Sequence, residues 1–243
     1  MIKKFKSTHT SRTLMFAELD KVMSHSIDGS DFAEILLNNV TGKKSSSNIQ
    51  KTATHIKSLY GFDMEYAPFA AFKYFWKNAE SSDKPMLALI YAINEDDLLA
   101  ESLAVITETL IGEKATIEAF ENVIEKYHPN NYTANTRKSL AQNIASSWKQ
   151  AGIIEGKVKN IRVQRVISYY VAGFAFLTSY LKGNRGEFIW NNVGVKALGL
   201  SENRLRELAV ECAKRDLMQY QYAGSVTAIS FNKLLNKIGI NAI

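Results

Sequence analysis

Residues 133–165 read TANTRKSLAQNIASSWKQAGIIEGKVKNIRVQR, and this stretch contains both signals that decide the fold class. Up to Gly152, apolar side chains recur at the three- and four-residue spacing of one helix face, and a glycine commonly follows a helix end. The apolar positions are Leu140, Ile144, Ala145 and Trp148. Residues 153–166 are β-branched and basic, and Gly156 can turn the chain, which predicts a short hairpin. A helix followed by a basic hairpin is typical of winged-helix modules.

The same order of elements recurs near the C-terminus. Ser201 can cap a helix, and strand-like runs at 217–222 and 226–231 flank the turn residues Ala223 and Gly224. The apolar face of this helix consists of Leu205, Leu208, Ala209 and Cys212. We therefore expect a second helix–hairpin unit, with a short last helix over 231–238.

A helix-turn-helix outline is predicted in the N-terminal quarter, after a first helix over Ser11–His25. Ser30 or Asp31 can cap a helix that extends to Val40. A turn over 41–44 contains Gly42, and small polar residues then lead into a helix that ends at Gly61. Two helices joined by a short glycine-containing turn form this motif.

Residues 68–127 are predicted to be wholly helical, with helices over 68–79, 85–93, 97–111 and 116–127. The apolar segment 166–181 is predicted to be a buried helix, because it is too short for the roughly 20 residues of a membrane span. Four turn-forming residues at 128–131 suggest a boundary between a helical domain, 1–127, and a basic winged-helix-like domain, 128–243. The expected fold is mainly α, a helical bundle with helix-turn-helix and winged-helix-like modules and one or two short β-hairpins.

Few residues point to catalysis. The single cysteine, Cys212, excludes an internal disulfide and a cysteine-based zinc finger, and the four histidines lack metal-ligand spacing. Gly183-Asn184-Arg185-Gly186 lacks the lysine and serine of a phosphate-binding loop. We therefore expect no cofactor, no metal, no enzymatic activity and no membrane association, and a location in the bacterial cytoplasm.

Charge is distributed unevenly along the chain. The formal net charge is +6, but residues 61–127 contain 13 acidic and 5 basic side chains, whereas residues 128–243 contain 6 and 16. A basic field on a folded segment attracts polyanions such as nucleic acid. The alternative is a solvated surface with uneven charge.

The first candidate for DNA contact is the helix over residues 45–60 with the turn before it. Its polar face carries the residue types that meet phosphates and base edges in the major groove. These residues are Lys43, Lys44, Gln50, Lys51, Thr54 and Lys57. The alternative is an amphipathic surface helix with ordinary lysines.

The second candidate is the helix–hairpin unit over 133–165, whose helix would enter the groove while the wing holds the backbone. Its proposed contacts are Asn135, Arg137, Lys138, Gln142, Lys157, Lys159, Arg162 and Arg165. A third candidate comprises basic residues of the C-terminal unit, where a scaffold role is equally compatible with the sequence. They are Lys182, Arg185, Arg204, Arg206, Lys214 and Arg215.

Parts of the second unit resemble a known family. The runs 133–137 and 143–152, followed by Gly156, Lys157 and Arg162, are similar to a segment of the BrxA family of bacteriophage exclusion (BREX) systems. The opening Thr10-Ser11-Arg12 is compatible with that family. The resemblance implies a nearly all-helical fold with two helix-turn-helix modules and modest double-stranded DNA binding without catalysis. It also implies partners in a defence system, including a methyltransferase and an ATPase.

The sequence thus favours a non-catalytic accessory protein that binds double-stranded DNA in a phage-defence system. If about six phosphates are neutralised, affinity should fall by about 10³-fold or more between 50 and 200 mM salt. Two alternatives stay open. One is a protein-interaction scaffold, which the acidic segment 61–127 favours, and the other is a transcriptional regulator that recognises a palindromic site as a dimer.

Overall fold

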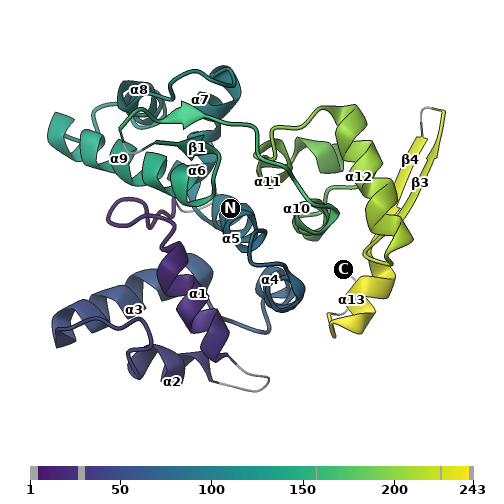
Figure 1. Cartoon of the computed structure of the whole chain (residues 1–243), viewed down its shortest axis with the longest axis horizontal. Helices are drawn as coiled ribbons and strands as arrows, with labels where there is room; N and C mark the ends of the chain where they lie inside the picture. Colours follow the sequence, from purple (N-terminus) through teal and green to yellow (C-terminus); the bar gives the residue numbers. More distant parts are fainter. Residues whose placement is uncertain (1–4, 27–30, 157, 225, 241–243) are drawn as a thin grey trace.

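Helices dominate the computed structural model, which describes residues 5–26, 31–156, 158–224 and 226–240 (Figure 1). Within these residues, 59% of the chain is helical, in 13 α-helices, and two antiparallel hairpins of two strands each complete the fold. The expected mainly α fold with short hairpins is therefore confirmed. The hydrophobic core is one cluster that extends from Leu14 to Ile240.

The N-terminal helices are α1 (Phe16–His25), α2 (Phe32–Leu37) and α3 (Ser46–Tyr60). Asp31 caps α2 and Ser45 caps α3, because each side chain accepts a hydrogen bond from a backbone N–H in the first turn. The expected start of the first helix at Ser11 is wrong. Residues 5–15 form an irregular segment, here called the strap, and Met15 at its end has a left-handed φ of 53°, which helices do not tolerate.

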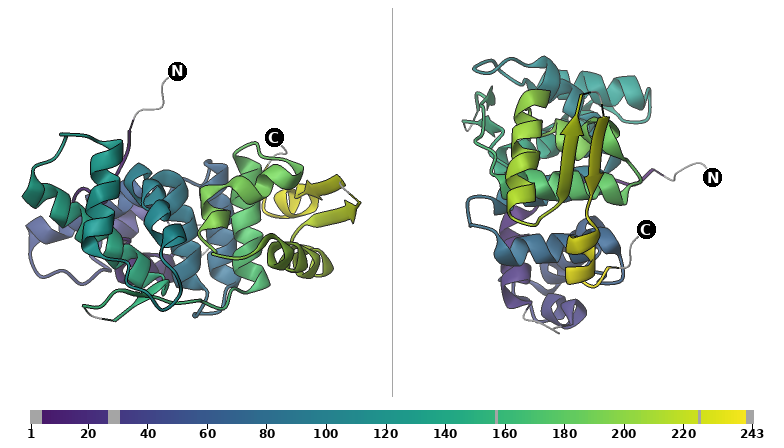
Figure 2. Two further views of the ribbon diagram at one scale, coloured as in Figure 1. Left: turned by 90° about the horizontal axis from the view of Figure 1, so that it is seen from above. Right: turned by 90° about the vertical axis from the view of Figure 1, so that its right-hand side faces the viewer.

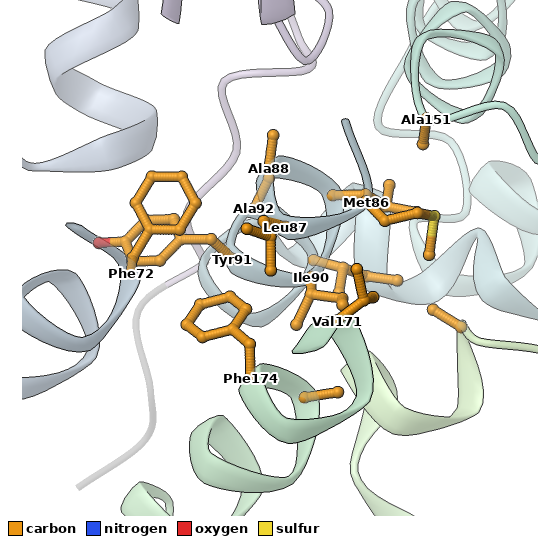
Figure 3. Close-up of a cluster of buried hydrophobic side chains, with 14 of the residues drawn as sticks. Phe72, Met86, Leu87, Ala88, Ile90, Tyr91, Ala92, Ala151, Val171 and Phe174 are labelled. Atoms are coloured by element: carbon orange, nitrogen blue, oxygen red, sulfur yellow. The ribbon is translucent and has the colours of Figure 1, made fainter. Parts of the chain in front are cut away.

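Helix α5 (Lys84–Glu95) is the centre of the molecule, and α4 (Ala67–Asn78) packs beside it. Every residue of α5 from Met86 to Asn94 is buried, so this helix has no solvent face. Figure 3 shows Phe72 of α4 and Phe174 of α10 (Tyr169–Leu181) beside Tyr91, and the ring centroids of Phe72 and Tyr91 are 4.8 Å apart. Helices α3, α9 (Ala134–Gln150) and α10 all contact α5, so this helix fixes their relative positions.

The next layer contains α6 (Asp97–Glu101), α7 (Leu103–Glu108), α8 (Ile117–Tyr127), α9 (Ala134–Gln150), β1 (Ile154–Glu155) and β2 (Ile161–Arg162). The expected single helix over 97–111 is instead two helices. The break is at Ser102, whose hydroxyl donates to the Leu99 carbonyl and accepts from Trp148 Nε1. The expected boundary at residues 127/128 falls in the turn between α8 and α9, which pack against each other.

The C-terminal part consists of α10 (Tyr169–Leu181), a 3₁₀ turn η1 (Gly186–Asn191), α11 (Val193–Lys196), α12 (Glu202–Lys214), β3 (Gln219–Ala223), β4 (Val226–Ser230) and α13 (Asn232–Lys237). Helix α10 is almost entirely buried, as the sequence predicts. Ser201 caps α12 by accepting from Arg204 N–H. Three helices followed by a hairpin form the winged-helix order, and Figure 2 shows α12 beside the β3–β4 hairpin at one end of the molecule.

Candidate nucleic-acid interface

Helix α3 has one buried face and one exposed basic face. Thr52, Ile56 and Leu59 are buried against the rest of the chain. The residues exposed on the opposite face or at the start of the helix are Lys44, Gln50, Lys51, Thr54 and Lys57. The helix contains no acidic residue.

The six residues proposed in and before α3 differ in what they can offer a ligand. Lys43 Nζ lies 2.8 Å from Glu18 Oε1, so its charge is compensated within the protein. The Thr54 hydroxyl donates to the Gln50 carbonyl oxygen. Lys44, Lys51 and Lys57 have no acidic partner among the described residues, so three of the four lysines keep their charge available.

Helix α9 holds the strap with polar side chains on one of its faces. Asn143 Nδ2 donates to the His9 carbonyl over 3.1 Å, Ser147 Oγ accepts from Leu14 N–H over 2.8 Å, and Gln150 Oε1 accepts from Phe16 N–H over 2.9 Å. Residues 143, 147 and 150 share a helix face because they are spaced by four and three. These three residues lie in the run 143–152, which resembles the BrxA family. Their side chains bind the chain's own backbone.

The strap is also held by a buried contact between a histidine and a carboxylate. His9 Nδ1 lies 3.0 Å from Asp96 Oδ2, and both side chains are almost inaccessible. Asp96 also accepts from Thr8 N–H and caps α6 through Leu99 N–H. Burial raises the pKa of the Asp96 carboxyl, but the nearby His9 and the hydrogen bonds outweigh burial and lower the pKa below its usual value.

The chain of contacts from Ser147 through His9 to Asp96 resembles that of a hydrolase triad. His9 Nε2 lies 2.8 Å from Ser147 Oγ, and His9 Nδ1 faces Asp96. Ser147 is fully buried, however, and its hydroxyl already donates to the Asn143 carbonyl and accepts from Leu14 N–H. No substrate carbonyl could reach this oxygen without displacing the strap. This cluster is therefore a structural lock for the strap.

A polar groove of about 400 Å³ lies where the strap, α3 and α9 meet. Its lining residues are Ser11, Arg12, Thr13, Met15, Glu18, Lys43, Asn48, Thr52 and Asn143. Figure 1 shows the strap between α9 and α3 on the same side of the molecule. Sequence reasoning missed this groove, because it assigned residues 11–15 to a helix.

The residues proposed on α9 are partly available at the surface. Asn135, Lys138 and Gln142 are exposed. Arg137 instead forms an ion pair with Glu125 of α8, which neutralises its charge. Helix α9 thus offers one uncompensated cation, Lys138, and two amides.

The wing residues are mostly structural. Arg162 is buried and donates to the Ile106 carbonyl, and burial lowers the pKa of its guanidinium. Arg165 donates to the carbonyls of Ala151 and Ser82. The expected DNA contacts of Arg162 and Arg165 are therefore corrected, because both side chains join elements of the fold. Lys159 is exposed.

The remaining wing position, Lys157, lies outside the described residues. Hairpin β1–β2 is short, with Ile154 opposite Arg162 and Glu155 opposite Ile161. The wing therefore contributes Lys159 as its one exposed cation among the described residues.

Both arginines of helix α12 are compensated, and Lys214 in its last turn is the exposed cation that this helix keeps. Arg206 contacts Glu202 at 2.6 Å and Glu187 at 2.8 Å, and its guanidinium lies over the Tyr222 ring. Arg204 contacts Glu207 at 2.7 Å. Elsewhere in this unit, the guanidinium groups of Arg185 and Arg215 lie over the rings of Tyr180 and Tyr169. The winged-helix order is thus present at this end without a free basic face on α12.

Searches for related family models, curated proteins and solved structures found no match to this chain. Among the described residues, no three His, Cys, Asp or Glu side chains are grouped as metal ligands, and no helix is long and apolar enough to cross a bilayer. The Cys212 thiol is buried and donates to the Tyr169 carbonyl, and burial raises its pKa to about 12. This thiol is therefore poorly suited to act as a nucleophile.

Proposed function

We propose that this protein binds double-stranded DNA through the helix-turn-helix formed by α2 and α3. One observation supports this most strongly: α3 exposes Lys51 and Lys57, Lys44 precedes it, and none of the three is neutralised by a described acidic residue. Lysines of this kind bind phosphates and release counterions from DNA. An α-helix also fits the width of the major groove.

The proposal assigns different roles to the side chains of this surface. Lys44, Lys51 and Lys57 contact phosphates, whereas Gln50 is positioned to meet a base edge from the same exposed face. Lys138 on α9 and Lys159 on the wing are further exposed cations. Since phosphate contacts outnumber base contacts in this set, binding is expected to depend weakly on sequence.

We also propose that DNA binding serves a bacterial phage-defence system of the BREX type, in the cytoplasm, as a non-catalytic accessory protein. The support is the sequence resemblance of residues 133–165 to the BrxA family. A methyltransferase and an ATPase are the proposed protein partners. Purification of a tagged chain from its host tests this directly, because neither partner would be retained if the proposal is wrong.

A scaffold function is a second candidate, and the C-terminal unit favours it. Val210, Tyr220 and Tyr222 line a shallow groove beside the compensated Arg206. Aromatic and aliphatic side chains without free charge are more typical of a protein interface than of a DNA interface. A stable partner complex without any retention of DNA would favour the scaffold over DNA binding.

The test of DNA binding is fluorescence anisotropy with a random-sequence duplex of about 30 base pairs. Lys51→Glu should weaken binding to all sequences and reduce the slope of log affinity against log salt by about 1 or more. Lys233→Glu is the matched control, because Lys233 is exposed on α13 at the opposite end of the molecule (Figure 1). Equal effects of the two substitutions would exclude α3 as the contact surface.

A further inference from the structure

Arg12 of the strap and the basic face of α3 meet at the polar groove. Arg12 lines the groove together with Asn48 and Thr52, which lie on the first two turns of α3. His55 lies three residues after the groove-lining Thr52 and four after Lys51, so Lys51 and His55 are on the side of α3 that borders the groove. Burial and the positive charges of Arg12 and Lys51 lower the pKa of His55. Three basic groups from two distant parts of the chain are therefore close in space.

The backbone around Arg12 is held from both sides. The Thr8 carbonyl accepts from the N–H groups of Ser11 and Arg12, each over 3.0 Å. On the other side, Thr13 Oγ accepts from Gln150 Nε2 over 2.9 Å. The position of Arg12 thus depends on the locked strap, whereas its own guanidinium donates only to the adjacent Ser11 carbonyl among the hydrogen bonds of the described residues.

The groove contains one acidic side chain, and that carboxylate is already compensated. Glu18 pairs with Lys43 at the rim, over 2.8 Å. Arg12, Lys51 and His55 therefore form a cluster of like groups without an acidic partner among the described residues. A phosphodiester group, which carries one negative charge, would offset the positive charges of Arg12 and Lys51 and accept hydrogen bonds from all three side chains.

We propose that Arg12, Lys51 and His55 together bind one phosphate of the DNA backbone, which would lie between the strap and α3. The inference rests on the proposed function and adds a binding residue from outside the helix-turn-helix. The guanidinium of Arg12 supplies paired N–H donors, Lys51 supplies a point charge and His55 supplies a ring N–H. Phosphate binding favours protonated His55, so complex formation takes up a proton.

The test compares Arg12→Ala with Arg204→Ala, which removes an exposed arginine from α12 with the same change in net charge. Each phosphate contact contributes about 0.9 to the slope of log affinity against log salt. It therefore changes the affinity by about eightfold for each tenfold change in salt concentration. We expect Arg12→Ala to lower the affinity for DNA about eightfold at 0.1 M salt and to reduce the slope of log affinity against log salt by about 0.9. Arg204→Ala should change the affinity by less than about twofold. Thermal unfolding checks that both variants are folded.

Two further measurements separate this inference from the proposed function. The double variant should lose less affinity than the product of the losses measured for Arg12→Ala and Lys51→Ala, because both residues bind the same phosphate. Wild-type affinity should rise between pH 7.5 and 6.0, and His55→Gln should remove that rise. If the wild type binds DNA and Lys51→Ala weakens it while Arg12→Ala does not, the inference fails and the proposed function stands. If the wild type does not bind DNA, the proposed function itself fails.

Discussion

Substitution of Asp96 by alanine tests whether the buried lock supports the fold. The change leaves Thr8 N–H and Leu99 N–H without their acceptor and removes the buried carboxylate 3.0 Å from His9 Nδ1. Each buried donor left unpaired costs about 1–3 kcal/mol, and each hydrogen bond to a charged group contributes about 1.5–3 kcal/mol. Because these effects overlap, we expect Asp96→Ala to lower the free energy of unfolding by about 3–5 kcal/mol.

Urea unfolding followed by circular dichroism at pH 7.5 measures this loss. For a chain of this length, the same loss corresponds to a decrease of about 6–20 °C in melting temperature. Asp96→Asn keeps one acceptor oxygen and should lose less, so it remains measurable if the alanine variant does not fold. Asp20→Ala is the control, because its side chain is 45% exposed and lies 3.9 Å from Lys84 Nζ. A loss below about 1 kcal/mol for Asp96→Ala would refute the lock.

Three other predictions concern stability. Trp148→Ala should cost about 3–5 kcal/mol, since the ring is fully buried and its Nε1 donates to Ser102; a urea midpoint close to that of the wild type would contradict this. Gly152→Ala should cost about 1 kcal/mol or more, because φ is +74° and the new Cβ would lie 2.5 Å from Arg165 Nη1; an unchanged melting temperature would argue against this strain. Since the folded-state pKa of Asp96 is lowered, its stabilisation is present above the unfolded-state pKa and lost as pH falls through the folded-state value. The unfolding free energy of the wild type should therefore fall more steeply below pH 4 than that of Asp96→Asn, and parallel pH profiles would count against it.

The element order could be predicted because its signals are local. Ser45, Thr133 and Ser201 each accept from a backbone N–H at the start of a helix, as residues of these types commonly do. Gly156 and Gly224 lie between the paired strands of the two hairpins, both with positive φ. Capping and turn residues act within a few positions, so a single sequence shows them.

The strap and its groove could not be predicted, because their partners are far apart in sequence. His9 and Ser147 are separated by 138 residues, and no local pattern links them. Apolar residues within 14–23 match helical spacing and hid the change of backbone direction at Met15. The strap is also held by Asn143, Ser147 and Gln150, and these contacts are evident only in the folded structure.

Charge patterns overestimated the number of available cations for a similar reason. Arg162 and Arg165 satisfy backbone carbonyls, and Lys43 and Arg137 pair with acidic side chains of neighbouring helices. Sequence composition counts these residues as free positive charge. Burial and pairing remove them, so the proposed surface is smaller than the basic content of the chain suggests.

The most direct test of the central claim is the salt dependence of wild-type binding to a random-sequence duplex. Lys44, Lys57 and the phosphate shared by Lys51 and Arg12 give about three phosphate contacts, which predicts a slope near −2.7 and a loss of about 40-fold between 50 and 200 mM salt. This is less than the 10³-fold loss expected from the sequence, because several of the basic residues are paired or buried. A linear decrease of log affinity with log salt of this size, and a smaller slope for Lys51→Ala, would support binding through α3. Absence of binding at 50 mM salt, or an affinity independent of salt, would contradict it.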